Sequence, residues 1–257
     1  MPARPTVRKR HGPTAELRVG RFARLDLGRS ARTGVPEIIL AEGKSPEHLV
    51  AILRALALRG EGALVSRPTA TQRRRLHQEA RAGLPLLPLA DGGVFRLRGR
   101  LPRIAARAPV ALLAAGTGDV PRAEESRAIL EALGVRCLHA YDVGVAGLHR
   151  LLRSLRRLER ERPGVYLVFA GREGALPTVV AGLVQAPVIG IPVSIGYGRG
   201  GGGTAALNAL LQSCAPIAVV NIDGSVPAAL VAARIVAPRG ESPPRRARGP
   251  RPRRKRA

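Results

Sequence analysis

The chain has 257 residues, enough for one α/β domain of about 130 residues and a smaller unit. Hydrophobic residues make up 45% of it, which excludes general disorder, and aromatic residues only 2%, so the core must be aliphatic. The formal net charge of +25 comes almost entirely from arginine and invites a nucleic-acid interpretation. Because much of this charge stands in the Arg- and Pro-rich segment 237–257, we expect a disordered tail there.

The N-terminus and the cysteines indicate a cytoplasmic protein. Residues 1–20 are basic, contain no apolar leader stretch and are expected to be disordered. Cys137 and Cys214 are the two cysteines of the chain, which suggests free thiols in a reducing compartment. A membrane span needs about 20 apolar residues in a row. The nearest candidate, 174–198, is interrupted by three prolines, so we expect no membrane segment.

Residues 21–108 are predicted to form a small N-terminal α+β region. A short strand at 37–41 precedes a helix in which Ser45 is the N-cap and Pro46 the first residue. Apolar residues at helical spacing give this helix one buried face: Leu49, Ile52, Leu53 and Leu56. Residues 61–108 alternate short apolar pieces with arginine clusters, and we interpret them as a small sheet that joins this unit to the main domain.

Residues 109–236 are predicted to form the catalytic domain. Five short apolar runs alternate here with helices, expected at 122–133, 145–161, from Pro177 onward, and at 204–213. The runs are PVALLAAGTGD, VRCLHAYDVG, GVYLVFAGREG, PVIGIPVSIGYG and PIAVVNIDG. This alternation is typical of βαβ units around a parallel sheet that is buried on both faces. The predicted fold class is therefore α/β, a doubly wound, mostly parallel sheet with helices on both faces.

Polar, glycine-rich segments follow all five predicted strands. In open parallel sheets, ligands bind beyond the carboxyl ends of the strands. We call these segments the strand-end ring: 116–121, 141–150, 170–177, 194–203 and 221–224. The residues predicted to bind substrate there are Thr117, Asp119, Asp142, His149, Arg172, Ser194, Gly196, Tyr197 and Gly198.

Several of these features have two interpretations. The glycine-rich loop before the helix at Thr204 is either a phosphate or carboxylate cradle or a flexible lid. Asp119 is either functional or a cap of the following helix. Glu173 interrupts an apolar stretch, which favours a functional role. Cys214 is either a small core residue or, next to the ring, a thiol that faces the crevice, whereas Cys137 lies in a strand and is assigned to the core.

At these segments the chain resembles the LarB family of pyridinium biscarboxylic acid mononucleotide synthases. The C-terminal domain of that family is similar to phosphoribosylaminoimidazole carboxylases. The likeness covers residues 21–60 and 109–225, and the matching stretches include RTGVPEIILAEGKSPEHL, AGTGDVPRAEE, YDVGVAGLHRLL and AGREGALPTVVAGLV. It implies an enzyme of nickel-pincer nucleotide biosynthesis that takes nicotinic acid adenine dinucleotide, adds carbon dioxide to ring carbon 5 and hydrolyses the phosphoanhydride to release AMP.

The resemblance also implies roles for individual residues. The reactive cysteine of the family falls on Cys214, whose thiolate would add to ring carbon 4, and its pocket acid falls on Glu173, which would remove the carbon 5 proton. Magnesium is the expected cofactor, with Asp119 and Asp142 as its ligands beside the diphosphate. A symmetric homo-oligomer with sites near the subunit contacts is also implied.

Two other functions fit parts of the sequence. The first is an aminoimidazole ribonucleotide carboxylase or mutase of purine biosynthesis, whose substrate is already an electron-rich enamine and needs no thiol. The second is a basic nucleic-acid-binding protein. The three Tyr and three Phe residues are scattered and form no stacking platform, so we expect nucleic acid to bind, if at all, through the tail and not as the main function.

Overall fold

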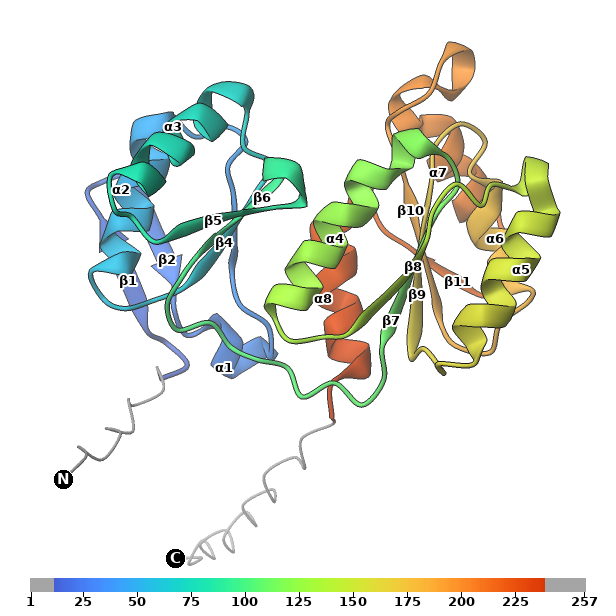
Figure 1. The fold of residues 1–257 in the computed structure, drawn as a ribbon, viewed down its shortest axis with the longest axis horizontal. Helices are drawn as coiled ribbons and strands as arrows, with labels where there is room; N and C mark the ends of the chain where they lie inside the picture. Colours follow the sequence, from blue (N-terminus) through green and yellow to red (C-terminus); the bar gives the residue numbers. More distant parts are fainter. Residues whose placement is uncertain (1–11, 239–257) are drawn as a thin grey trace, which may run out of the picture.

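The computed structural model describes residues 12–238, which form two adjoining units (Figure 1). The N-terminal unit contains a two-stranded hairpin and a four-stranded sheet, and the C-terminal unit contains a five-stranded sheet. The predicted disorder of residues 1–11 and 239–257 lies outside the described residues.

The hairpin corrects the prediction for residues 12–20. Strands β1 (Glu16–Val19) and β2 (Ala23–Asp26) pair antiparallel, followed by the short helix α1 (Arg29–Thr33). Leu17 and Val19 alternate with polar residues, so both side chains point to one face, and both are buried. We expected the disordered segment to reach residue 20, but this alternation makes an ordered strand from Glu16.

The four-stranded sheet follows the order β3-β4-β6-β5. Its strands are β3 (Ile38–Leu40), β4 (Ala63–Ser66), β5 (Leu86–Leu89) and β6 (Val94–Leu97), with the short 3₁₀ turn η1 (Ala90–Gly92) before β6. β3 and β4 are parallel because a helix connects them, while β6 pairs antiparallel with both β4 and β5. Three of these strands form the small sheet expected within residues 61–108, and the fourth, β3, comes from the preceding segment.

Two capped helices cover one face of this sheet. In α2 (Pro46–Ala57), the Ser45 hydroxyl accepts a hydrogen bond of 3.1 Å from the His48 amide, which confirms the predicted N-cap. The predicted apolar face of α2 is buried as well. The second helix, α3 (Ala70–Arg81), was not predicted, and it begins with a capping box between Thr69 and Gln72.

The five-stranded sheet of the C-terminal unit is entirely parallel, in the order β11-β10-β9-β7-β8. Its strands are β7 (Val110–Ala114), β8 (Cys137–Ala140), β9 (Val165–Ala170), β10 (Val188–Pro192) and β11 (Ile217–Val219). Every residue of β7, β9 and β10 is buried, as expected for strands that are covered on both faces. Counted from β7, the order is 2-1-3-4-5, so the chain reverses its winding direction between β7 and β9.

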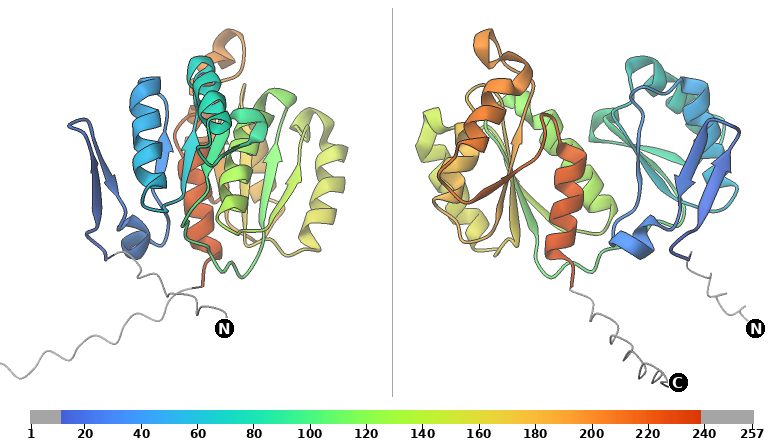
Figure 2. Two further views of the ribbon diagram at one scale, coloured as in Figure 1. Left: turned by 60° about the vertical axis from the view of Figure 1, so that its left-hand side comes forward. Right: turned by 180° about the vertical axis from the view of Figure 1, so that it is seen from behind.

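Helices cover both faces of this sheet, which confirms the predicted α/β fold class (Figures 1 and 2). The elements are α4 (Val120–Ala132) and α8 (Ser225–Val236) on one face, and α5 (Leu148–Glu159), α6 (Ala175–Ala181) and α7 (Thr204–Leu211) on the other. Three 3₁₀ segments precede helices: η2 (Thr117–Asp119), η3 (Val145–Gly147) and η4 (Gly198–Gly203). Helix α8 was not predicted.

One of the three buried apolar clusters contains residues of both units. The side chains of β4 alternate, so Val65 faces α2 and α3, while Leu64 faces the opposite way. Leu64 and Val94 belong to the same buried cluster as Ile129 and Leu130 of α4. Helix α4 therefore lies between the two sheets, as Figure 1 shows.

No helix within residues 12–238 is both long and apolar enough to cross a membrane.

Candidate functional site

Asp119 joins the ends of β7 and β9, the point where the winding direction reverses. One carboxylate oxygen accepts a 2.8 Å hydrogen bond from the Gly116 amide, and the other accepts a 3.0 Å bond from the Gly171 amide. The side chain is buried, with 6% of the residue exposed. Asp119 directly precedes α4, but its carboxylate makes no capping bond to that helix. The helix-cap interpretation is therefore wrong, and Asp119 instead ties two segments of the strand-end ring together.

The environment of Asp119 makes its carboxyl group a weaker acid than an exposed aspartate. Burial raises the pKa of this carboxyl above its ordinary value, and the negative charge of Glu173 adds a smaller effect in the same direction. The hydrogen bonds from Gly116 and Gly171 oppose both effects without cancelling them. Glu173 itself is exposed. The ends of β7 and β9 therefore carry one buried and one exposed carboxyl group that are close enough to interact.

Asp223 joins the ends of β10 and β11 in a similar way. Its carboxylate accepts bonds from the Ser194 amide at 3.0 Å and the Ser194 hydroxyl at 2.7 Å, and from Arg122 at 3.2 Å. Burial alone would raise the pKa of Asp223, but the Ser194 bonds and the charge of Arg122 outweigh burial and lower it. Asp223 is therefore held as a carboxylate that fixes the start of the glycine-rich loop.

The glycine-rich loop packs closely against the end of β9. A Cβ atom added to Gly171 would lie 2.3 Å from the Ile195 carbonyl oxygen, and one added to Gly200 would lie 3.2 Å from Arg172 Cα. The Arg172 guanidinium stands 4.6 Å from the centre of the Tyr197 ring. Both side chains are exposed. The predicted residues of the β9 and β10 ends are thus brought together at one edge of the sheet.

The other predicted residues of the ring are exposed. Asp142 is exposed and forms an ion pair with Arg150 at 2.5 Å. His149, in the first turn of α5, and Thr117, in η2, are also exposed. Gly196 and Gly198 belong to the glycine-rich loop, and Gly198 has a positive φ of 58°. The binding roles of these residues stay predictions.

Cys214 does not lie with the ring in the same chain. Helix α7 begins at the carboxyl end of β10 and runs back, so the segment between α7 and β11 lies where the parallel strands begin. The thiol is exposed there, three residues before Ile217. The expectation that Cys214 stands beside the strand-end ring is wrong within one chain, because ring and thiol are at opposite ends of β11. Cys137, which was assigned to the core, is only partly buried and packs against the cluster that contains residues of β7, and burial raises the pKa of its thiol to about 12.

The residues predicted to hold magnesium do not form a ready ion site. Both oxygens of Asp119 accept hydrogen bonds from backbone amides, and Asp142 pairs with a guanidinium. Within residues 12–238, no group of three or more His, Cys, Asp and Glu side chains could hold a metal ion. Magnesium prefers one or two carboxylates with free oxygens, together with water and phosphate. This donor set does not fit the ion.

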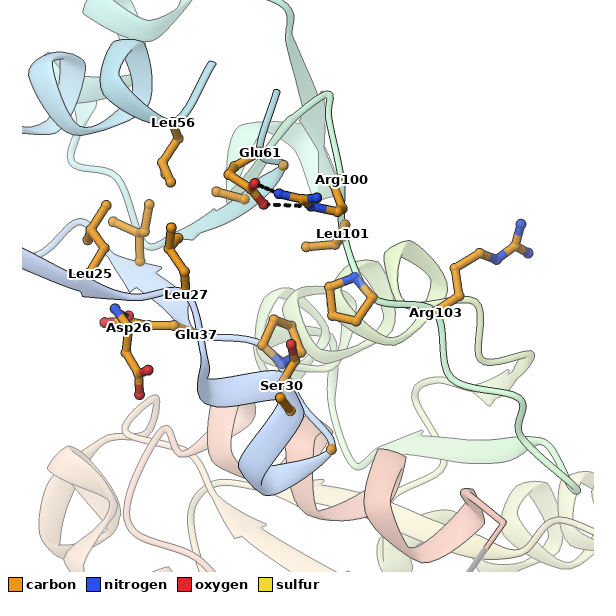
Figure 3. Close-up of a pocket in the computed structure, with 17 residues that line it drawn as sticks. Leu25, Asp26, Leu27, Ser30, Glu37, Leu56, Glu61, Arg100, Leu101 and Arg103 are labelled. Atoms are coloured by element: carbon orange, nitrogen blue, oxygen red, sulfur yellow. Dashed lines mark hydrogen bonds and ion pairs between the residues drawn. The ribbon is translucent and has the colours of Figure 1, made fainter. Parts of the chain in front are cut away.

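A cavity of about 550 Å³ lies away from the ring, in the N-terminal unit (Figure 3). Leu25 of the hairpin and Leu56 of α2 form part of its apolar wall. Glu61 and Arg100 form an ion pair on another wall. None of the residues predicted to bind substrate lines this cavity.

The sequence interpretation missed four polar residues that hold the ring in place: Arg67, Arg122, Glu125 and Ser225. Glu125 is buried although it is an acid, and Arg67 comes from the N-terminal unit. The only available signal was the spacing of Arg122 and Glu125, which places both on one face of the predicted helix. The contact of Arg67 with residues more than 150 positions away has no local signature.

Fold and ring together define a class: a doubly wound α/β protein with polar, glycine-rich segments at the carboxyl ends of its strands. The family described as AIR carboxylase matches residues 109–248, more than half of the chain. A second family, described as LarB/PurE-like N-terminal domain, matches residues 17–84. The chain therefore belongs to the AIR carboxylase family of carboxylase and mutase enzymes, and it carries a LarB/PurE-like N-terminal domain.

Similar proteins fall into two groups. Uncharacterized protein MJ0165 of Methanocaldococcus jannaschii is 36% identical over 209 residues, which cover 79% of this chain and 80% of that protein. The N5-carboxyaminoimidazole ribonucleotide mutase of Pyrococcus horikoshii is 32% identical over 133 residues, 49% of this chain and 71% of the mutase. The mutase of M. jannaschii is 30% identical over 139 residues, 52% of this chain and 82% of the mutase.

Among solved structures, Treponema denticola PurE is similar at 26% identity with a TM-score of 0.42, covering 50% of this chain and 80% of that one.

Proposed function

We propose that this chain is a LarB-type carboxylase and hydrolase. Its substrates would be nicotinic acid adenine dinucleotide, carbon dioxide and water, and its products pyridinium-3,5-biscarboxylic acid mononucleotide and AMP. The reaction would supply an early intermediate of nickel-pincer nucleotide biosynthesis. The observation that carries this proposal is the union, in one chain, of a LarB/PurE-like N-terminal domain and an AIR carboxylase domain.

The pattern of relatives supports this choice over a purine enzyme. The two mutases are similar over only about half of this chain, whereas MJ0165 is similar over most of it. M. jannaschii has both MJ0165 and a separate protein named as the mutase. The longer relative is therefore additional to the mutase in that organism, which favours a different substrate for chains with both domains.

The chemistry starts from an electron-poor ring. A thiolate that adds to carbon 4 of the pyridinium turns the ring into a neutral dihydropyridine, in which carbon 5 is a nucleophilic enamine carbon. Carbon 5 attacks carbon dioxide, a base removes its proton, and the carbon–sulfur bond then breaks with its electron pair returning to sulfur. The ring recovers its aromaticity and carries a second carboxylate. Separately, water cleaves the phosphoanhydride and releases AMP.

The strand-end ring offers groups for these steps. Glu173 is exposed at the crevice beside Asp119 and is our candidate for the base. Arg172 and Tyr197 stand above the same edge, where a guanidinium attracts carboxylate and phosphate groups. The amides of the glycine-rich loop are placed to approach an anion closely.

The position of Cys214 adds a requirement. The Cys214 thiol and the strand-end ring of the protein lie at opposite ends of β11. A thiolate mechanism therefore needs Cys214 of one copy to meet the strand-end ring of another copy. The exposure of Cys214 permits such a contact. We therefore include a homo-oligomer with shared sites in the proposal.

Turnover tests the proposed function directly. Purified protein is incubated with nicotinic acid adenine dinucleotide, bicarbonate and magnesium, and the products are identified by mass spectrometry. We expect the doubly carboxylated mononucleotide and AMP, and we expect Cys214→Ala to abolish the carboxylated product. Cys137→Ala is the matched control for loss of a thiol. Full activity of Cys214→Ala would exclude the thiolate step.

Mixing two inactive variants tests the shared site. Cys214→Ala and Glu173→Gln would each lack one group, and co-expressed chains would form some sites that contain both wild-type residues. We expect partial recovery of activity in the mixed oligomer and none in either variant alone. An inactive mixture that assembles normally would exclude a site built from two copies.

The second candidate function is an N5-carboxyaminoimidazole ribonucleotide mutase, which the names of several relatives favour. That substrate is an electron-rich enamine and requires no thiol. Conversion of N5-carboxyaminoimidazole ribonucleotide, equally fast in Cys214→Ala, would support this function and overturn the first.

A further inference from the structure

The two units meet at a buried polar cluster beside the strand-end ring. Its centre is Glu125 of α4, a carboxylate with 3% of the residue exposed. Ser66 of the N-terminal unit and Ser225 of α8 both donate hydroxyl hydrogen bonds to it. A buried carboxylate is costly unless several donors satisfy it, so this cluster is a built feature of the interface.

Arg67 connects this cluster to the ring. The residue directly follows β4, and its guanidinium contacts three partners in the C-terminal unit. Its Nε donates to Glu125 at 3.1 Å, and its Nη2 donates to the Ser225 hydroxyl at 3.1 Å and to the Asp223 carbonyl oxygen. The Arg67 side chain is 22% exposed, so these bonds are largely shielded from water.

The contact with Asp223 reaches the glycine-rich loop. Asp223 adopts a left-handed conformation with φ 56°, which costs free energy for any residue except glycine. Arg67 holds the Asp223 backbone at its carbonyl oxygen, while the Asp223 side chain holds the amide and the hydroxyl of Ser194. Only one residue, Asp223, thus separates Arg67 from the start of the loop.

We propose that Arg67 is a positioning residue, through which the N-terminal unit fixes Asp223 and thereby the glycine-rich loop of the site. The kinetic consequence rests on the proposed function, but the structural consequence does not. In this arrangement the N-terminal domain takes part in the site without touching the substrate, because its arginine determines where Ser194 and the loop amides stand.

Hydrogen exchange tests the structural consequence without any substrate. The Ser194 amide donates to Asp223, so loss of Arg67 should speed exchange in the segment 193–203. We expect Arg67→Met to raise exchange there by about tenfold or more. Arg54→Met is the matched control, since Arg54 also pairs with a nearly buried acid, Glu79, within the N-terminal unit. Unchanged exchange at 193–203 in folded Arg67→Met would overturn the proposal.

Steady-state kinetics test the functional consequence. A displaced loop weakens substrate placement, so Arg67→Met should raise KM about tenfold, with kcat changed less than about threefold. Arg54→Met should leave both parameters unchanged. If Arg67 acts through Asp223, then adding Arg67→Met to Asp223→Ala should change KM no further. If the increases in KM of the two single variants multiplied in the double variant, Arg67 would act by a route other than Asp223.

The proposed function and the role of Arg67 can be tested separately. If the wild-type chain turns over neither proposed substrate, the proposed function fails, and the exchange experiment alone decides the role of Arg67. If Arg67→Met does not fold, Arg67→Lys replaces it: lysine keeps the charge but cannot bridge three acceptors in a fixed fork. Faster exchange at 193–203 in Arg67→Lys supports the proposal, and wild-type exchange contradicts it.

Discussion

Two aspartates of the strand-end ring have pKa values that shift in opposite directions. Asp119 is buried with only backbone amides as donors, and its pKa is raised. Asp223 also loses hydration, but it gains the Arg122 charge and two bonds from Ser194, and its pKa is lowered. A carboxylate next to a cation is favoured over its neutral form, whereas burial without a cation has the opposite effect. The same residue type thus occupies two electrostatic environments at one edge of the sheet.

Asp223 should contribute to stability in a pH-dependent way. Its folded-state pKa is below the ordinary value of 3.8, so its contribution is present above that value and is lost as pH falls through the folded pKa. Asp223→Asn lacks this ionisation. We expect the free energy of unfolding in urea to fall less for the variant than for the wild type between about pH 5 and pH 2.

Other carboxyl groups titrate in both proteins, so only the difference between the two curves reports Asp223. Asp119, whose pKa is raised, acts with the opposite sign, because its contribution is full at low pH and declines as pH rises through its folded pKa. Asp142→Asn, which removes an exposed ion pair, is the control. The prediction would be contradicted if the free energy of unfolding fell equally with pH, between about pH 5 and pH 2, for wild type and Asp223→Asn.

Glu173 should matter for turnover and not for folding. Its side chain is exposed, so Glu173→Gln should change the free energy of unfolding by less than about 0.5 kcal/mol. As the proposed base, its loss should lower kcat by about 10²–10⁴-fold. The comparison is with Glu161→Gln, another exposed acid, which pairs with Arg136. A kcat within threefold of wild type, roughly, would remove Glu173 from the base role.

At the scale of elements, the close approach of the β9 and β10 ends depends on Gly171. Any side chain there would meet the Ile195 carbonyl oxygen and the Asp119 carboxylate, so the backbone must move. We expect Gly171→Ala to lower the free energy of unfolding by about 1–3 kcal/mol and to displace the glycine-rich loop. Urea unfolding and hydrogen exchange of residues 193–203 measure the two effects.

Gly182→Ala is the matched control for the glycine substitution. A Cβ atom at Gly182 would have no neighbour nearer than 3.5 Å, and its φ of −76° suits any residue. We expect this variant to be as stable as the wild type or slightly more stable, since alanine restricts the unfolded chain. If the two alanine variants had equal free energies of unfolding, the ends of β9 and β10 could move apart without a measurable loss of stability.

The elements show what sequence patterns could reveal. The buried parallel strands were predictable because they form continuous apolar runs between turn residues, as in β9. Helix α3 was missed because its buried residues, Gln72, Leu76 and Glu79, include only one apolar side chain, so no apolar stripe marks it. Helix α8 buries mainly alanine, a residue with weak periodic contrast.

The candidate site was predictable in the same partial way. The ring of strand ends follows from strand direction, and it correctly brought Asp119, Gly171 and Ser194 to one edge. The direction of α7 also follows from that rule, and it places Cys214 at the other edge. The role of Arg67 depends on how two units pack together, which no local pattern encodes.

At the scale of the whole chain, the positive charge of residues 239–257 can be separated from catalysis. Deleting this segment should leave turnover unchanged, because the strand-end ring lies within residues 116–224. Binding to DNA should weaken and lose much of its salt dependence, since arginine contacts to phosphate release counterions. Fluorescence anisotropy at about 50 and 200 mM salt measures this. Loss of turnover on deletion would make the segment part of the enzyme.

The position of α4 between the two sheets bears on how the protein comes apart. Leu64 and Val94 pack against α4, the same helix that covers the parallel sheet. Unfolding of either unit would therefore expose apolar residues of the other unit to water, so we expect the two units to unfold together. In an excised fragment that begins at residue 109, the apolar face of α4 that packs against Leu64 and Val94 would be exposed to solvent. Such a fragment should aggregate. Two family descriptions divide the chain, but unfolding by heat or denaturant should occur in a single cooperative transition.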